Sequence, residues 1–213
     1  MREVINRYIE ILAREPIFWD IFEKIFGDNG AKERLYKSKI PNTCRILDFG
    51  CATGNTTKPF INYDYLGVDK DCKAIQGAKK KWKKNKKVQF KCLDILETQN
   101  KIGSFDAILF AGTGHHIPDK ELVKILKKLS RYLRKRGALH YIDTIKPDRD
   151  KGAIVNWLCN IDRGREMRTQ KETLELMRKI GHFYIIDQTS VERVTQSLLP
   201  QPDYIYLKLI PKR

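Results

Sequence analysis

The fold is decided by one stretch of the sequence, Leu47-Asp48-Phe49-Gly50-Cys51-Ala52-Thr53-Gly54. Together with Arg45 and Ile46 before it, its first residues form a segment of strand length. Small residues then make up the turn that follows the strand. Glycine adopts backbone conformations that other residues avoid and lets a second group approach the chain closely. A small-residue turn at the end of a strand is therefore a place where an open α/β sheet binds a ligand.

Downstream of this turn, short apolar runs alternate with amphipathic stretches. We expect strands at 45–49, 65–69, 88–93, 105–110, 138–145, 183–187 and 204–210. We expect helices at 71–84, 120–133 and 170–180, with Gly137 ending the second of them. Alternation of this kind is typical of βαβ units with a parallel sheet, whereas two strands without a helix between them pair antiparallel. The prediction is a doubly wound α/β sheet of seven strands, mostly parallel, with a C-terminal antiparallel hairpin.

Two regions lie outside this alternating core. Residues 4–26 predict two short helices broken at Pro16, and we interpret residues 1–40 as an N-terminal helical lid over a domain at 41–213. An insertion at about 146–169 separates the fifth strand from the last helix. A length of 213 residues suits one domain with such elaborations rather than two full domains.

The composition indicates the cellular compartment of the protein and the state of its cysteines. No apolar run approaches the roughly 20 residues that span a bilayer, and the charged N-terminus does not resemble a secretory signal. The five cysteines form no CxxC pair and no metal-ligand spacing. We therefore expect a cytoplasmic protein with reduced thiols, no disulfide, no metal and no membrane insertion.

The formal net charge of +16 is high for this length. Nucleic acid, a membrane surface or an anionic substrate would be attracted by it. Lysines gather at 79–87 around Trp82, and such a patch could bind phosphate. Lysines that merely solvate ordinary amphipathic helices explain the same charge without any partner, and we favour that explanation.

Two familiar ligand turns do not fit the stretch after the first strand. A P-loop requires Lys-Ser or Lys-Thr after its second glycine, and the chain has Lys58-Pro59 out of alignment. A dinucleotide fingerprint counted from Gly50 would need glycine where Ala52 and Asn55 stand. Only one of its three glycines is present, so a nicotinamide-dependent oxidoreductase is disfavoured.

A third pattern matches more closely. At Asp48, Gly50, Ala52 and Gly54 the chain resembles the D-x-G-x-G-x-G signature of class I S-adenosylmethionine-dependent methyltransferases, with alanine in place of the middle glycine. Alanine is still small, so the departure is mild. The resemblance covers roughly residues 45–145 with good motifs, and beyond them it extends only to the order of strands and helices.

The resemblance implies that S-adenosylmethionine binds at the carboxyl ends of the first three strands. Asp48 would face its ammonium and sulfonium groups, Asp69 would accept hydrogen bonds from both ribose hydroxyls, and Asp94 would contact the adenine amino group. Asp94 could instead cap a helix. The expected cofactor-binding residues are Asp48, Gly50, Cys51, Ala52, Thr53, Gly54, Asp69, Lys70, Asp94, Ile95, Ala111 and Gly112.

Paired histidines follow the fourth strand in Gly114-His115-His116-Ile117-Pro118, which looks like the small-molecule branch of this family. Histidine can act as a general base near neutral pH, so His115 and His116 are the candidate catalytic residues. Methyl transfer is an in-line displacement that positioning alone can accelerate. Packing against the cofactor loop is therefore the alternative role for either histidine.

In the family that the chain resembles, the N-terminal helices and the insertions build the acceptor pocket. The candidate acceptor-binding residues are therefore Trp19, Phe22, Trp157, Arg163 and Arg165. Arginines of the insertion, Arg168 included, would suit a carboxylate or phosphate through bidentate pairing. A solvated arginine-rich loop is the alternative for the arginines, and the aromatic residues could equally form the core of the N-terminal helices.

The predicted function is methyl transfer from S-adenosylmethionine to a small-molecule acceptor, which an anionic group would suit. One alternative is an RNA methyltransferase that uses the basic surface. It is not favoured, because the segment after the fourth strand is not of the (D/N/S)-P-P-(Y/F/W) type and no RNA-binding module is visible. The other alternative is a catalytically idle methyltransferase-like binding module. No residue of the sequence is tied to one acceptor atom or to one oligomeric state.

Overall fold

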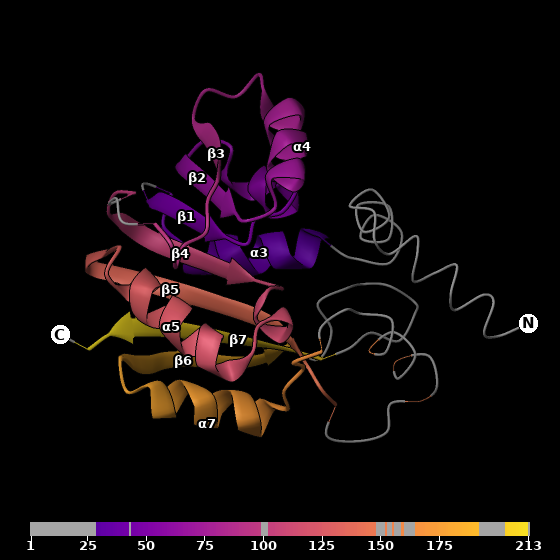
Figure 1. Cartoon of the computed structure of the whole chain (residues 1–213), viewed down its shortest axis with the longest axis vertical. Coiled ribbons are helices and arrows are strands. Elements are labelled where there is room, and N and C mark those ends of the chain that lie inside the picture. Colours follow the sequence, from indigo (N-terminus) through magenta and orange to yellow (C-terminus); the bar gives the residue numbers. More distant parts are fainter. Residues whose placement is uncertain are drawn as a thin grey trace, which may run out of the picture.

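A computed structural model describes residues 29–42, 44–98, 102–147, 165–191 and 203–212, with the single positions 152, 155 and 159. One sheet runs through it in the order β3-β2-β1-β4-β5-β7-β6 (Figure 1). Its strands are β1 (Arg45–Phe49), β2 (Asp64–Asp69), β3 (Val88–Cys92), β4 (Phe105–Ala111), β5 (Leu133–Ile145), β6 (Phe183–Val191) and β7 (Asp203–Pro211). Pairing is parallel from β3 across to β5, and β7 lies antiparallel between β5 and β6. The predicted seven-stranded, mostly parallel sheet with an antiparallel C-terminal pair is confirmed.

Helices cover both faces of this sheet. They are α3 (Asn29–Lys39), α4 (Cys72–Trp82), α5 (Asp119–Ser130) and α7 (Gln170–Ile180), with the short 3-10 helices η1 (Asn55–Phe60) and η2 (Gly114–His116). α5 and α7 lie together over one face (Figure 1), where their leucines and isoleucines join one core cluster. α3, η1 and α4 contribute to a second cluster. Successive residues of β1 belong to different clusters, Ile46 to the second and Leu47 to the first, as alternation along a strand requires.

Helix ends carry the expected chemistry. Asp71 caps α4 by accepting hydrogen bonds from two backbone amides of its first turn. Thr169 and Glu172 form a reciprocal capping box at the start of α7, and Gly181 ends that helix with a left-handed φ of 70°. These local signals explain why α7 occupies the predicted range.

The expected helix at 120–133 ends earlier than predicted. α5 stops at Ser130, and β5 begins at Leu133 and runs through Gly137 instead of starting after it. The β4–β5 register shifts between Phe105 and Ala107. A Cβ at position 137 would lie 2.9 Å from the carbonyl oxygen of Phe105, so this glycine permits a close backbone approach at an irregularity of the sheet. It does not terminate a helix.

The element after the small-residue turn is short. The turn opens the 3-10 helix η1 rather than an α-helix, and Pro59 stands inside that short element. Proline lacks the backbone donor that a longer helix would need there.

The expectation of reduced cysteines is wrong for one pair. Cys72 at the start of α4 and Cys92 at the end of β3 form a disulfide, with their Cα atoms 5.0 Å apart. The pair meets because β2 and β3 are parallel neighbours and Asp69, three residues before Cys72, is in register with Cys92. Spacing along the chain carries no sign of that pairing. Cys44 and Cys51 are free thiols.

The two predicted elaborations are described only in part. In the segment 1–40, α3 is described, and its Tyr36 is buried in the core cluster beneath the sheet together with Ile40. The helices expected at 4–26 lie outside the described residues, so the lid role stays a prediction. The insertion at 146–169 has both ends in view, where the backbone N–H of Lys146 donates to the carbonyl of Arg168 at 2.8 Å. Among the described residues, no helix has the length and apolarity to cross a membrane.

Candidate functional site

The turn after β1 is built from three left-handed positions. Gly50, Ala52 and Gly54 have φ values of 74°, 44° and 75°. These are the three positions at which the signature calls for glycine. Ala52 adopts this conformation at a cost of about 1–2 kcal/mol, since its Cβ approaches the following carbonyl. The backbone geometry that the small residues predicted is therefore present, with some strain at the alanine.

Asp69 fastens this turn to the end of β2. Its Oδ2 accepts the backbone N–H of Ala52 at 2.9 Å, and its Oδ1 accepts that of Asp71 at 2.9 Å. The side chain is half-buried, so its oxygens are held in a fixed orientation at the carboxyl edge of the sheet. Such a carboxylate can accept further hydrogen bonds from a ligand's hydroxyl groups.

Asp48 lies beneath the turn and not on its surface. It is buried, and its Oδ2 accepts hydrogen bonds from Thr56 Oγ1 at 2.6 Å and from the hydroxyl of Tyr65. Burial raises the pKa of this carboxyl to about 6, although the two hydrogen bonds oppose the shift. The side chain therefore supports the turn from inside, and it places a negative charge beneath the turn when the carboxyl group is ionised.

Asp94 follows β3 at the same edge. Its Oδ1 accepts the backbone N–H of Leu96 at 2.8 Å, and its carbonyl accepts that of Thr98, so it opens a turn rather than a helix. Its neighbour Ile95 is buried in the core cluster. The disulfide between Cys72 and Cys92 lies in this part of the edge, close in sequence to both Asp69 and Asp94.

The segment after β4 touches the turn directly. A Cβ on Gly50 would lie 2.5 Å from Thr113 Oγ1, so the absence of a side chain at Gly50 lets the two loops pack. Ala111 is half-buried, and Gly112 has a φ of 61° with open space where a side chain would point. The sequence-predicted cofactor residues of β1, β2 and β4 thus converge at adjacent strand ends.

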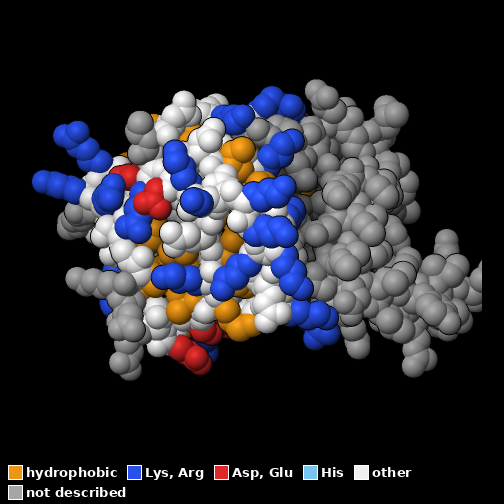
Figure 2. Space-filling model, turned by 90° about the horizontal axis from the view of Figure 1, so that it is seen from above, with side chains coloured by type: hydrophobic (Ala, Val, Ile, Leu, Met, Phe, Trp, Pro, Cys, Tyr) orange, Lys and Arg blue, Asp and Glu red, His pale blue; other side chains and the backbone are white. Residues whose placement is uncertain are grey.

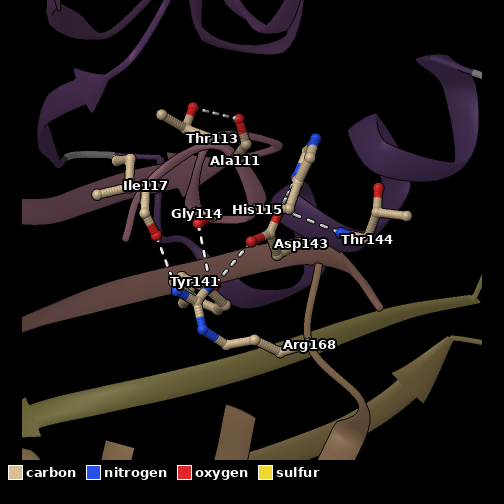
Figure 3. A network of polar contacts seen from close by, with 9 residues as sticks. All are labelled: Ala111, Thr113, Gly114, His115, Ile117, Tyr141, Asp143, Thr144 and Arg168. Atoms are coloured by element: carbon tan, nitrogen blue, oxygen red, sulfur yellow. Dashed lines mark hydrogen bonds and ion pairs between the residues drawn. The ribbon is translucent and has the colours of Figure 1, made fainter. Parts of the chain in front are cut away.

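Two residues beyond Thr113, a buried polar network begins (Figure 3). His115 Nδ1 lies 2.5 Å from Asp143 Oδ1, and both side chains are at least 95% buried. The other oxygen, Asp143 Oδ2, accepts the hydroxyl of Tyr141 at 2.7 Å, and Oδ1 also accepts the backbone N–H of Thr144. A buried carboxylate fixes a neighbouring imidazole in one tautomer and orientation. The arrangement can hold a histidine as a base.

Sequence reasoning missed Asp143 and Tyr141, which lie in what reads as a plain apolar strand at 138–145. The signal that could have found them is a carboxylate near the carboxyl end of a buried strand. Such a group needs a partner, and in a parallel sheet the nearest partners come from the end of the adjacent strand.

Arg168 proves to be structural, which corrects its suggested role in binding an anionic acceptor. It is buried, its Nε donates to Asp119 Oδ1 at 2.7 Å, and its terminal nitrogens donate to the carbonyls of Gly114 and Ile117 (Figure 3). Since its donors are committed to η2 and the start of α5, the guanidinium braces the loop that carries His115.

The remaining candidates divide by location. His116 is exposed, and its ring centroid lies 4.1 Å from that of His115. Arg165 is exposed at the returning end of the insertion, where the backbone N–H of Glu166 donates to the carbonyl of His115. The other acceptor-binding candidates lie outside the described residues: Trp19, Phe22, Trp157 and Arg163.

Comparison with known proteins places this geometry in context. Residues 46–137 match the family model of the methyltransferase domain. A carboxy-S-adenosyl-L-methionine synthase of Helicobacter pylori is 31% identical over 113 residues, which cover 51% of this chain and 45% of that protein. An uncharacterized methyltransferase of Bacillus cereus is 27% identical over 147 residues, covering 68% of this chain and 60% of the relative.

Among solved structures, the N-methyltransferase NodS of Bradyrhizobium japonicum in complex with S-adenosyl-L-homocysteine superimposes with a TM-score of 0.68. The match covers 97% of this chain and 98% of that one, at 14% sequence identity. At this identity the likeness shows the fold. The chain spans about half the length of the first curated relatives it matches.

Proposed function

We propose that this chain, which carries a methyltransferase domain on the class I S-adenosylmethionine-dependent fold, transfers a methyl group from S-adenosylmethionine to a small-molecule acceptor. One observation carries the proposal. The left-handed turn that ends at Gly54 is tied through the Ala52 N–H to Asp69, a fixed and half-exposed carboxylate on the neighbouring strand.

The residues present fit the methyl donor by their chemistry. Asp48, Asp69 and Asp94 stand at or just beyond the carboxyl ends of adjacent strands β1, β2 and β3. A ligand with an ammonium, a sulfonium and two ribose hydroxyls finds negative charge and hydrogen-bond acceptors along that edge. When bound, S-adenosylmethionine supplies an electrophilic methyl group. Asp69 would hold the ribose, Asp94 the adenine side and Asp48 the charge beneath the turn.

His115 is the base that we propose for the acceptor's proton. Asp143 accepts from Nδ1, so Nε2, on the opposite side of the ring, is the nitrogen that can receive a proton. The same carboxylate stabilises the imidazolium that forms. Asp143 and Tyr141 are then positioning residues, because they act through the imidazole. Their near-complete burial excludes water from the side of the ring that faces the sheet.

The acceptor pocket is proposed on the side where the insertion returns. Glu166 is hydrogen-bonded to the backbone of His115, so the end of the insertion lies against the candidate base. Trp19, Phe22, Trp157, Arg163 and Arg165 stay our candidates for the walls of this pocket. An acceptor with a carboxylate or phosphate would suit the two arginines. The network of His115, Asp143 and Tyr141 supports an active enzyme over an idle binding module, because a binding module does not need an oriented base.

A ligand titration tests the cofactor half of the proposal. Calorimetry should show binding of S-adenosylmethionine and S-adenosylhomocysteine and none of NAD. Asp69→Asn should weaken both by at least about tenfold, the order expected for losing a charged partner of two hydroxyls. Glu175→Gln, an exposed carboxylate on α7, is the matched control and should change nothing. Tight NAD binding without a response to the methyl donor would overturn the assignment.

A product assay tests the acceptor half. The protein is incubated with S-adenosylmethionine and fractionated small-molecule or RNA pools, and release of S-adenosylhomocysteine is followed. Turnover with small-molecule fractions supports the proposal, whereas turnover confined to RNA fractions contradicts it while leaving the cofactor assignment intact.

A further inference from the structure

A pocket of about 520 Å³ lies at the end of α4, and lysine makes up most of its lining. Its lysines come from the end of α4 and the loop to β3: Lys80, Lys81, Lys83, Lys84, Lys86 and Lys87. The other lining residues carry no charge. Figure 2, which looks onto this end of the molecule, shows many lysine and arginine side chains and few acidic ones.

The pocket belongs to the amino edge of the sheet. Ile61 and Asn62 on its wall precede β2, and Lys87 directly precedes β3. The candidate cofactor residues follow the opposite ends of the same strands, and β2 alone separates the two edges by roughly 17 Å at about 3.3 Å per residue. The lysine pocket is therefore not the acceptor pocket of the proposed reaction.

The loop that presents these lysines is held in place by hydrogen bonds. Asn85 Nδ2 donates to the carbonyl of Ile61 at 2.7 Å, and Asn85 Oδ1 accepts the N–H of Lys87. Trp82 Nε1 donates to the carbonyl of Gly54 at 3.2 Å, which anchors the end of α4. The ammonium groups thus project from a preorganised backbone, and a ligand does not have to pay for ordering the loop itself.

The charges of this pocket are not neutralised by carboxylates within the described part of the chain. The ion pairs found there use Lys39, Arg45, Arg134, Arg168 and His115, and none uses a pocket lysine. The contacts that two pocket lysines make are to neutral oxygens, from Lys81 to the side chain of Asn55 and from Lys87 to the carbonyl of Asn62. Six like charges brought together in this way favour binding of a polyanion.

We propose that this lysine pocket binds the phosphodiester backbone of a nucleic-acid strand. Trp82 is the aromatic residue of the pocket, and its indole is half-buried with Nε1 bonded to Gly54, so the ring leaves little surface for a base to stack on. Recognition therefore runs through phosphates, with little dependence on sequence. RNA and DNA share this chemistry and should bind alike.

A lipid surface fits the pocket less well. Basic membrane-binding surfaces place apolar side chains beside their lysines. The large apolar side chains exposed in the described residues, Tyr184 and Ile186, lie on β6, at the opposite edge of the sheet from β3.

The test compares two variants that remove the same formal charge from different places. One is Lys80→Glu/Lys83→Glu/Lys84→Glu/Lys86→Glu in the pocket. The control is Lys120→Glu/Lys124→Glu/Lys171→Glu/Lys179→Glu on the exposed surfaces of α5 and α7. Fluorescence anisotropy with labelled 20-nucleotide RNA and DNA, read over a salt series, gives affinity and salt slope. Melting temperature and S-adenosylhomocysteine binding verify that both variants stay folded.

The pocket variant should lose at least about tenfold in affinity, and its slope of log K against log salt should fall by about 3, at roughly 0.7 per phosphate released from a single strand. The control should keep most of the affinity and the slope. Equal losses in both variants would mean that net charge alone attracts the strand, and no binding by the wild type would also overturn the proposal. Binding to anionic phosphatidylserine vesicles in place of nucleic acid would assign the pocket to a lipid surface instead.

Discussion

At the scale of single residues, two buried carboxylates, Asp48 on β1 and Asp143 on β5, have different hydrogen-bond partners. Asp48 accepts hydroxyls beneath the turn and has a raised pKa, whereas Asp143 pairs with an imidazole. Burial disfavours the charged form of a carboxyl group that has no charged partner, whereas a partner that can become cationic favours that charged form. Asp48 therefore stabilises the turn after β1, and Asp143 can orient His115 as a base.

Asp48 predicts a pH dependence of stability. Its pKa in the folded state is about 6, above its ordinary value of 3.8, so the folded protein binds more protons than the unfolded chain between these limits. Stability must then fall as the pH rises from about 4 to about 6, by up to about 3 kcal/mol from this group. Denaturant unfolding across this range should show the fall in wild type, and the difference from Asp48→Asn should isolate it. Parallel pH profiles for the two proteins would contradict the assignment.

Asp143 predicts a kinetic signature at His115. Asp143→Asn should lower kcat by about 10²–10⁴ with a small change in KM, because an amide can hold the imidazole in the wrong tautomer. The acidic limb of the pH–rate profile should shift as well, which a purely structural defect would not cause. His116→Gln, at the exposed neighbouring ring, serves as the control and should keep the wild-type profile. Loss of activity with an unchanged profile would argue that Asp143 only supports packing.

At the scale of elements, the disulfide ties the start of α4 to the end of β3. These two elements flank the strand ends at which Asp69 and Asp94 stand. The bond therefore holds together the two segments that border the proposed adenosine side of the site. The bond is exposed at both cysteines, so reductant can reach it.

Reduction of the Cys72–Cys92 bond should lower the stability of the folded protein. Closing a loop of about 20 residues contributes about 3 kcal/mol to stability in the chain-entropy model. Dithiothreitol should therefore lower the melting temperature of the wild type and weaken S-adenosylhomocysteine binding. Cys72→Ser/Cys92→Ser should start from those lowered values and not respond to reductant, and Cys159→Ser should behave like wild type. A wild type indifferent to reductant would show that the bond carries no stability.

Prediction from sequence succeeded for elements and failed for contacts between them. The apolar run at 45–49 and the amphipathic pattern at 170–180 coincide with β1 and α7, because local alternation and caps define both. The Cys72–Cys92 bond and the His115–Asp143 pair depend on which strands lie side by side, and spacing along the chain does not encode that. Gly137 shows the same limit, since one glycine suits a helix end and a close strand contact equally well.

At the scale of the whole molecule, the sheet separates two kinds of surface. Carboxylates and the histidine network gather at the carboxyl edge, while the lysine pocket lies at the amino edge beside β3. The candidate cofactor turn was predictable because its chemistry is contiguous in sequence. The acceptor-binding residues were predicted by resemblance alone, and all but Arg165 lie outside the described residues.

The insertion leads to a prediction at this scale. Replacing residues 149–163 by a short Gly-Ser linker should leave S-adenosylhomocysteine affinity within about twofold and remove acceptor turnover, since the linker spans two fixed ends and loop length changes closure entropy only slowly. Replacing residues 83–87, the α4–β3 loop, by such a linker would be the contrasting change, because Asn85 of that loop is hydrogen-bonded to Ile61. Lost cofactor binding in the insertion variant would show that the insertion is part of the methyl-donor site.

The backbone bond between Lys146 and Arg168 explains why such an exchange is feasible. The chain leaves β5 and comes back beside the end of that strand before it enters α7, and Arg168 secures the returning end against the loop of His115. A segment whose two ends meet in this way can be exchanged without altering the register of any strand. Exchange of the insertion alone would therefore change the acceptor specificity that we propose for it. The sheet and the proposed methyl-donor site would stay the same.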